Sequence, residues 1–235
     1  MRRGRRNGLI ATAVAVAGLL ATATLHPALA FDPFGPSGTV TVTPTASNQF
    51  AGTFDRGAGS REFTSRLGAP PEGGAGALEL RTPGDGDKVQ FVTDEVAGPL
   101  ERFRSSSYWA IRDPESGSDA MPSFQIAVDI NGGDLGPQEL HLLTFLPESA
   151  PAGTWTRYDI GSGTFCLTQK TAGVDAYREC ADGGEQFTLD EVADAHPGVS
   201  AYAAGANQGM GNAGLTSAVD LLQVGNRTYD LEPGS

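Results

Sequence analysis

The clearest indication of the fold class is the segment Ser123-Phe124-Gln125-Ile126-Ala127-Val128-Asp129-Ile130. Its even-numbered positions all carry large apolar side chains: Phe124, Ile126, Val128 and Ile130. Because successive side chains of a strand point to opposite faces, this alternation predicts a half-buried β-strand. Asn131-Gly132-Gly133 follows directly and has the composition of a tight hairpin turn.

Similar short runs, rich in Val, Phe, Tyr and Thr, recur between glycines and prolines. The 32 Gly and 15 Pro in 235 residues leave little room for long helices. Besides residues 123–130, we predict strands over 39–43, 49–54, 77–81, 88–92, 103–112, 140–146, 154–159, 164–169, 199–207, 218–224 and 227–231. Segment 57–76 is expected to be a long surface loop or two weak edge strands.

One helix has a defined beginning and end. Thr188 and Glu191 have the spacing of a capping box, in which each side chain bonds the backbone N–H of the other. Pro197 cannot continue a helix, so the helix is predicted near 189–195. Many short strands with one short helix predict an all-β protein, an antiparallel β-sandwich or jelly roll.

Residues 1–30 have the three parts of an export signal. Four arginines open the chain, an apolar run covers 9–20, and Ala28-Leu29-Ala30 matches a signal-peptidase site. The run is shorter than the ~20 residues that span a bilayer, so a membrane anchor is disfavoured. We expect cleavage after Ala30, a flexible leader over 31–38, one domain over 39–235 and an extracellular location. Arg5-Arg6 leaves a twin-arginine route open beside the general secretory one.

The chain is acidic, with a formal net charge of −12, and removal of the signal makes it more acidic because residues 1–30 contain no Asp or Glu. Such a chain is repelled by phosphate backbones and by anionic lipid. Nucleic acid and membrane surfaces are therefore excluded as expected partners, and we expect a monomer.

Cys166 and Cys180 are the only cysteines. In an exported chain, two cysteines are expected to form one disulfide. The alternative is a metal-binding or nucleophilic pair, which is disfavoured because two thiolates without an intervening histidine make a poor zinc site.

Catalytic patterns are weak. His141 in a predicted strand and His196 at the helix end are interpreted as structural, and no Gly-x-Ser-x-Gly elbow is present. The acid-x-acid patterns Asp85-x-Asp87 and Asp113-x-Glu115 fall in predicted turns rather than on a strand beside an aromatic platform. The sequence therefore favours a protein that is not an enzyme.

Metal patterns are equally weak. Residues 129–134 superficially resemble a calcium loop, but Leu140 stands where such a loop has its twelfth-position glutamate. We assign no cofactor and no metal ligands. A structural calcium ion held by scattered carboxylates and carbonyls stays open, because an acidic chain favours cations.

Aromatic and amide side chains are the candidate ligand-binding residues, because sugar rings stack on aromatic rings and amides bind hydroxyls. Tyr108 and Trp109 are neighbours on a strand and point to opposite faces, as do Trp155 and Tyr158 in a regular strand. The glycine-rich segment 207–214, expected to be a loop, adds three amides: Asn207, Gln208 and Asn212. The alternatives are core packing for the tryptophans and local backbone hydrogen bonding for the amides.

Four segments together resemble a broad, mostly uncharacterised group of secreted actinobacterial β-sandwich proteins. They are Gly153-Thr154-Trp155-Thr156-Arg157-Tyr158-Asp159, Ala195-His196-Pro197, residues 205–212 and Thr228-Tyr229-Asp230-Leu231-Glu232. The group usually has Tyr-Asp-Phe-Glu in the last motif, where this chain has Leu231. The resemblance extends over about Val40 to Glu232. It implies an extracellular jelly-roll, concanavalin-like or carbohydrate-module-like sandwich, and it implies no catalytic residue.

Together these observations lead us to expect a secreted, non-catalytic binding module for extracellular or cell-wall carbohydrate. The alternative is a structural or protein-interaction component of the cell envelope. A polysaccharide hydrolase or lyase with an unrecognised site is the third hypothesis.

Overall fold

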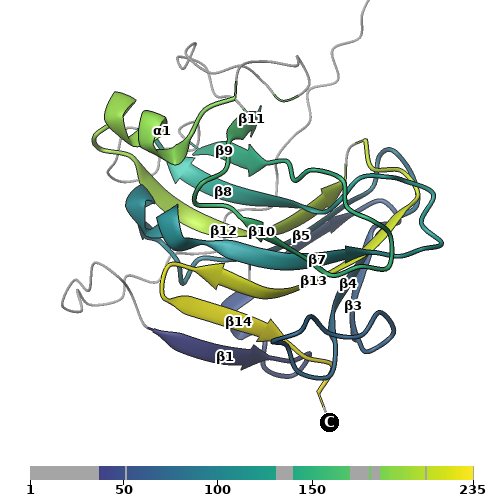
Figure 1. Cartoon of the computed structure of the whole chain (residues 1–235). Helices are drawn as coiled ribbons and strands as arrows, with labels where there is room; N and C mark the ends of the chain where they lie inside the picture. Colours follow the sequence, from purple (N-terminus) through teal and green to yellow (C-terminus); the bar gives the residue numbers. More distant parts are fainter. Residues whose placement is uncertain are drawn as a thin grey trace, which may run out of the picture.

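Two β-sheets pack face to face in the computed structural model (Figure 1). It describes residues 37–50, 52–130, 140–169, 180, 186–209 and 211–234. The expected export signal, nearly all of the expected leader and the hairpin turn at 131–133 lie outside the described residues. The predicted all-β sandwich with one short α-helix is confirmed.

The first sheet has seven strands: β1 (Gly38–Val42), β14 (Arg227–Leu231), β13 (Leu215–Val224), β4 (Ala77–Thr82), β3 (Ser60–Thr64), β7 (Ser107–Arg112) and β10 (Thr156–Asp159). Its long central strand β13 pairs with β7 along one edge. The other edge pairs with β4 over the first half of β13 and with β14 over the second half. The sheet therefore forks where β4 gives way to β14. The β1–β14 pair is parallel, an exception to the predicted antiparallel pattern.

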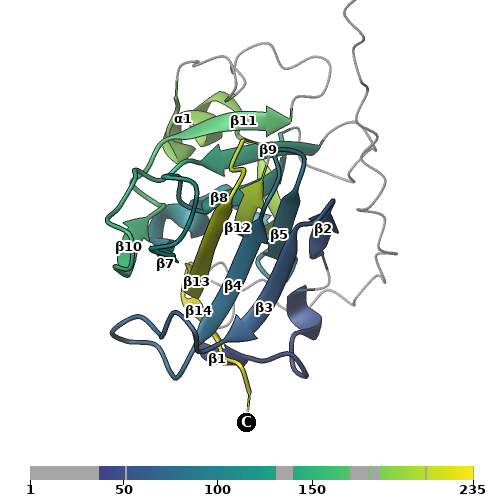
Figure 2. The same ribbon diagram turned by 90° about the vertical axis from the view of Figure 1, so that its right-hand side faces the viewer.

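The second sheet also has seven strands: β11 (Phe165–Gln169), β9 (Leu140–Phe145), β8 (Ser123–Asp129), β12 (Ser200–Gly209), β5 (Lys88–Thr93), β2 (Phe54–Arg56) and β6 (Gly98–Pro99). Figure 2 shows β4 and β3 of the first sheet in front of β12 and β5 of the second. The alternating segment Ser123–Asp129 forms β8, between β9 and β12.

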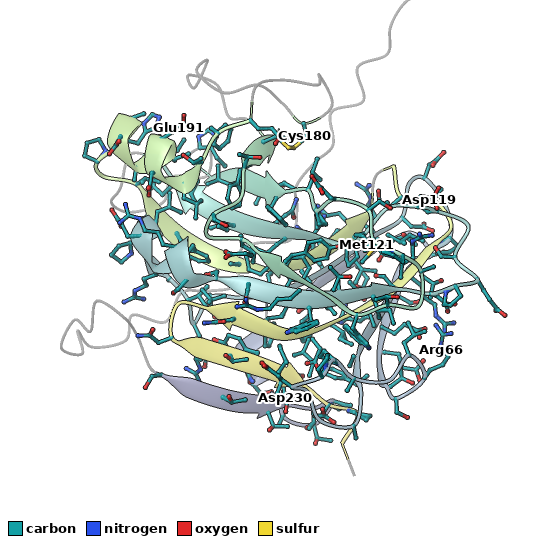
Figure 3. The ribbon with its side chains drawn as sticks, in the orientation of Figure 1. Arg66, Asp119, Met121, Cys180, Glu191 and Asp230 are labelled. Atoms are coloured by element: carbon teal, nitrogen blue, oxygen red, sulfur yellow. A yellow bond between two sulfur atoms is a disulfide. The ribbon has the colours of Figure 1, made fainter. Side chains whose placement is uncertain are left out.

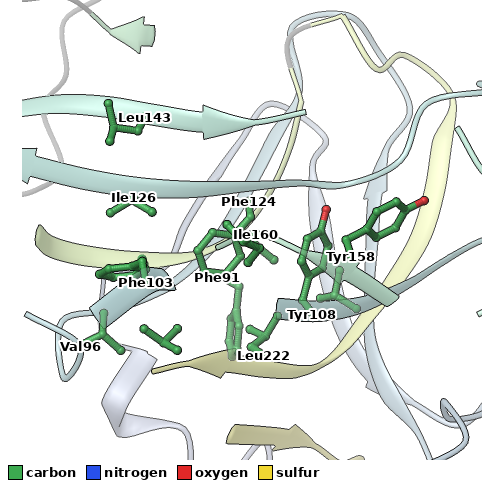
Figure 4. Close-up of a cluster of buried hydrophobic side chains, with 14 of the residues drawn as sticks. Phe91, Val96, Phe103, Tyr108, Phe124, Ile126, Leu143, Tyr158, Ile160 and Leu222 are labelled. Carbon is green, nitrogen blue, oxygen red and sulfur yellow. The ribbon is translucent and has the colours of Figure 1, made fainter. Parts of the chain in front are cut away.

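The main core fills the space between the sheets, as predicted from strand alternation (Figure 4). Phe124 and Ile126 of β8 point inward and are fully buried. Gln125 and Asp129 on the opposite face of β8 are buried as well, so the prediction of a half-buried strand is wrong on this point. Aromatic side chains pack against one another in this core. The rings of Phe50 and Phe91 stack with centroids 4.1 Å apart, and the ring centroids of Tyr108 and Phe124 are 5.8 Å apart. Burial of these large apolar side chains provides the main driving force for packing the two sheets.

The helix α1 (Leu189–Ala195) begins and ends where it was predicted. Thr188 Oγ1 accepts a hydrogen bond from the Glu191 amide at 3.2 Å, and the Thr188 amide donates to Glu191 Oε2 at 2.7 Å. Leu189 and Val192 are buried against the core. The predicted disulfide between Cys166 and Cys180 is present, with the two Cα atoms 5.0 Å apart.

Two predicted strands differ from the structure: the segment 49–54 is a strand only at Phe54, and the segment 103–112 is a strand only from Ser107 onward. Residues 48–50 form the 3₁₀ helix η1 (Asn48–Phe50), and residues 100–105 form η2 (Leu100–Ser105) ahead of β7. Residues three apart lie on the same side of a 3₁₀ helix, and Leu100 and Phe103 are both buried in this way. Segment 57–76 contains one edge strand, β3, followed by a long loop.

Candidate functional site

The outer face of the first sheet brings two predicted ligand-binding residues together. In β7, Tyr108 and Ala110 point into the core, so Trp109 points outward. Trp155 directly precedes β10 and packs on a second, smaller apolar cluster formed by Ala77, Ile111 and Ala218. Both tryptophans are half-buried. Exposed Arg157 is the β10 partner of Trp109. We call Trp109, Trp155 and Arg157 the tryptophan face.

The two candidate tyrosines lie on the other side of the same strands, inside the core. The Tyr108 hydroxyl donates to the Pro122 carbonyl at 2.7 Å, and the Tyr158 hydroxyl donates to the Glu148 carbonyl at 2.9 Å. Burial raises the pKa of both phenols, that of Tyr158 to about 12. Figure 4 shows both rings among the core side chains. Both hydroxyls are therefore already bonded to backbone carbonyls of the protein.

The predicted loop that carries the amides is partly a strand. Asn207 and Gln208 belong to β12, and Asn212 alone lies in the connection to β13. Gln208 crosses between the sheets: its Nε2 donates to the Leu215 carbonyl at 2.9 Å, and its Oε1 accepts from Ser217 at 2.6 Å. The three amides therefore do not form one site.

Asn207 lies on the second sheet, far in the fold from the tryptophan face. Its Nδ2 donates to Ser123 Oγ at 2.8 Å, and the side chain is buried. Asn212 is half-buried, and its carbonyl accepts a hydrogen bond from Thr82 Oγ1 at 2.9 Å. Neither residue contributes to the face that carries Trp109 and Trp155.

Residues 65–76, which we call the covering loop, run across the outer face of the first sheet. At one end, Arg66 forms ion pairs with Glu79 and Asp113. The loop then reaches Trp155, whose Nε1 donates to the Leu67 carbonyl at 3.3 Å. Figure 3 labels Arg66 at the first end of this loop and Asp230 on β14, beside its second end. The loop therefore borders the tryptophan face.

Three carboxylates meet under the second end of the covering loop. Asp220 of β13, Asp230 of β14 and Glu232 each place one oxygen within 4.8 Å of the others. We call these residues the acid cluster. Asp220 is the β13 partner of Trp109, so the acid cluster and the tryptophan face are neighbours.

The fork in the first sheet explains the position of Asp220. Its Oδ1 accepts the amides of Leu221 and Leu231, both at 2.7 Å, where β13 changes partner from β4 to β14. Leu221 has a φ of 45°, a strained value for a non-glycine residue. The Asp220 side chain thus accepts hydrogen bonds from two amides that have no backbone acceptor where the strand pairing is interrupted.

The environment of the acid cluster favours the protonated form of Asp220. Burial raises the pKa of Asp220 from 3.8 to about 7, and the charges of Asp230 and Glu232 act in the same direction. The amides of Leu231 and Leu221 oppose this rise. Burial followed by the charge of Glu232 also raises the pKa of Asp230.

The acid cluster was not predicted from the acid-x-acid patterns Asp85-x-Asp87 and Asp113-x-Glu115. Asp230-x-Glu232 has the same acid-x-acid spacing as the two patterns that were considered, and this pair does begin on a strand. Asp220 is ten residues earlier and joins the cluster only through strand pairing. The two considered patterns do lie in turns, where Asp87 accepts the Gly84 amide at 2.7 Å and Asp113 accepts the Glu115 amide at 2.8 Å.

His141 lies in β9 and His196 follows α1, close enough for their charges to interact. Figure 1 shows β9 and α1 at the opposite end of the molecule from β14. His141 is buried. Burial lowers its pKa, the neighbouring His196 lowers it further, and Asp129 opposes the change. A neutral buried imidazole fits the structural role predicted for His141.

Comparison with protein-family models, with curated proteins and with solved structures found no match to this chain. Within the described residues, no helix combines the length and apolar character needed to cross a membrane.

Proposed function

We propose that this protein is an exported, non-catalytic module that binds extracellular or cell-wall carbohydrate on its tryptophan face. The observation that carries the proposal is the placement of Trp109 and Trp155 on one outer sheet face. Both rings are half-buried, so part of each can contact a ligand. Sugar rings offer apolar C–H surfaces that pack on aromatic rings, and Arg157 beside them is a hydrogen-bond donor for hydroxyls or acidic groups.

Binding is favoured over hydrolysis by the burial of the neighbouring acids. A glycosidase needs two carboxyl groups that reach the scissile bond from opposite sides. Asp220 has the raised pKa of a general acid, but its side chain is fully buried and Gly73 of the covering loop lies against its Oδ2. A glycosidic oxygen cannot approach a carboxyl group in this position.

An extracellular setting is supported by two features of the chain. Residues 1–30 have the pattern of an export signal. The disulfide between Cys166 and Cys180 is of a kind that persists in oxidising compartments. The resemblance to secreted actinobacterial sandwich proteins points to the same location.

Retention on insoluble polysaccharides, followed by a glycan array, tests the proposal. The informative variant is Trp109→Ala, which removes the half-buried, outward-facing ring and leaves the inter-sheet core unchanged. Its matched control is Tyr202→Ala, which removes an aromatic ring that is 37% exposed on β12 of the other sheet. We expect Trp109→Ala to weaken retention at least about tenfold, equivalent to about 1.4 kcal/mol, and Tyr202→Ala to leave it unchanged.

Three results would overturn the proposal. One is a wild-type protein that no polysaccharide or array glycan retains. Another is retention that Trp109→Ala leaves unchanged. The third is equal loss in both variants, which would place binding elsewhere or reflect a general loss of folding, and circular dichroism of the variants separates these causes.

A further inference from the structure

We propose that the acid cluster of Asp220, Asp230 and Glu232 binds a calcium ion, which fastens the second end of the covering loop to the first sheet. The inference does not depend on carbohydrate binding. It follows from the geometry of the three carboxylates, from unpartnered oxygens buried among them and from the absence of a compensating cation in the described part of the chain.

The spacing of the carboxylates fits a single ion. One oxygen from each residue lies within 4.8 Å of the others. Calcium binds oxygen at 2.3–2.6 Å, so two oxygens on one ion are separated by at most about 5 Å. All three donors are carboxylate oxygens, the ligand type of a hard cation, and no Cys or His belongs to the cluster. This set favours calcium over zinc.

Asp220 provides the second, independent observation. Its side chain is fully buried, and while Oδ1 accepts two amides, Oδ2 accepts no hydrogen bond within the described structure. An added Cβ on Gly73 would lie 2.7 Å from this Oδ2, so the oxygen is directed between the sheet and the covering loop. Asp230 Oδ1 is likewise buried and unpartnered among the described residues. Buried carboxylate oxygens without partners are costly, and a cation would satisfy both.

Charge compensation within the described residues is incomplete. No salt bridge there involves Asp220, Asp230 or Glu232, and Arg66 of the covering loop is engaged by Glu79 and Asp113. The cluster receives backbone amides instead: Ala75 donates to Glu232 at 2.9 and 3.0 Å, and Gly74 donates to Asp230. Amide dipoles offset only part of three adjacent negative charges.

Glycines allow the loop to lie this close to the acids. An added Cβ on Gly74 would lie 2.1 Å from Glu232 Oε1, closer than any side chain can approach. The backbone of residues 73–75 can therefore sit directly against the cluster. An ion held there would join β13 to β14 at the fork of the first sheet. It would also hold in place the Asp230 and Glu232 carboxylates that accept the amides of Gly74 and Ala75 in the covering loop.

The test uses the mature chain, with calcium itself and terbium as a luminescent substitute. Calorimetry should give one calcium ion per chain, and magnesium should bind more weakly because it demands a stricter geometry. Trp109 is the strand partner of Asp220, so excitation of tryptophan should sensitise bound terbium. At a hundredfold excess of calcium over its Kd, the melting temperature should rise by about 5–10 °C relative to EDTA.

Two conservative variants and one control locate the site. Asp220→Asn keeps an oxygen for the amides of Leu221 and Leu231, and Glu232→Gln changes a half-buried residue, so both should fold. Each should abolish sensitised terbium emission and the calcium-dependent shift in melting temperature. Glu72→Gln removes an exposed carboxylate from the same covering loop and should keep both.

Limited proteolysis reports on the covering loop. Arg66 is exposed at the first end of this loop, so trypsin cleavage after Arg66 should be several-fold faster in EDTA than in calcium. In Asp220→Asn the rate should no longer depend on calcium.

The proposal fails if the wild-type protein binds no calcium at millimolar concentration, which would leave a shared proton as the means of compensating the acids. It also fails if calcium binds and shifts the melting temperature equally in Asp220→Asn and in the wild-type protein. Loss of carbohydrate retention with intact calcium binding would contradict only the proposed function.

Discussion

The acid cluster makes the stability of the calcium-free protein depend on pH through Asp220. The pKa of Asp220 is about 7 in the folded protein, compared with 3.8 as its ordinary value. The folded state therefore holds this proton more tightly than the unfolded chain does. The resulting stabilisation is complete below pH 3.8 and is lost as the pH rises through 7. Asp220→Asn has no proton to lose and should escape this loss.

The expected size follows from the two pKa values. Each pH unit between them corresponds to about 1.4 kcal/mol, so the full difference is about 4 kcal/mol. The free energy of unfolding of Asp220→Asn, minus that of the wild-type protein, should rise by this amount between pH 3.5 and pH 8. The fully buried side chain is shielded from solvent, so its protonation contributes to stability with little screening.

Urea unfolding followed by tryptophan fluorescence, in EDTA at several pH values, measures this difference. Comparing two proteins at each pH removes the effect of the other acidic residues, which titrate in both. Glu72→Gln, in the exposed part of the covering loop, should give a much smaller change. A difference that stays constant within about 1 kcal/mol, or that increasingly favours the wild-type protein at high pH, would refute the assignment of a raised pKa to Asp220.

Three further predictions concern the fold. Gln208→Leu should lower the free energy of unfolding by about 1–3 kcal/mol, because it leaves the buried Ser217 hydroxyl without its acceptor. Adding Ser217→Ala should recover part of the loss in urea unfolding, because the Leu215 carbonyl still lacks its donor, and a purely additive double variant would contradict this. Replacing Cys166 and Cys180 by Ser should lower the free energy of unfolding by about 3 kcal/mol, given their sequence separation of 14. An unchanged urea midpoint would contradict a stabilising role of this disulfide. Thr188→Ala should lower the free energy of unfolding by about 1 kcal/mol, because it removes the N-cap of α1. An unchanged melting temperature would show that α1 does not contribute to cooperative unfolding.

Local patterns predicted most of the fold because they involve residues that are close together in the chain. The alternation of Phe124 and Ile126 with polar neighbours predicted β8 and the face that it turns to the inter-sheet core, but not that the opposite face is buried too. The pair Thr188 and Glu191 predicted the first turn of α1. Such signals fail where the same short apolar pattern is compatible with a strand and with a helix. Leu100 and Phe103 belong to the 3₁₀ helix η2, although a strand was predicted from residue 103 onward.

The candidate site was predictable only in part, for a related reason. Alternation along β7 indicated that Trp109 and Tyr108 face opposite ways, and the structure decides that the tryptophan is the outer one. The same reasoning could not show that β12 continues through Asn207 and Gln208. The Gln208 side chain turns inward to Ser217, a residue whose position depends on the other sheet.

Local patterns were enough to predict the all-β class, the capped helix and the disulfide, because propensity, alternation and capping act over a few neighbouring residues. Which residues meet on the outer face of the first sheet depends instead on how distant strands pair. Asp220 joins Asp230 and Glu232 because β13 exchanges β4 for β14 as its partner at that point. The covering loop closes over them because Gly73 and Gly74 allow its backbone to approach. Strand pairing across the sheet brings the three acids together, and local sequence patterns do not predict which strands pair.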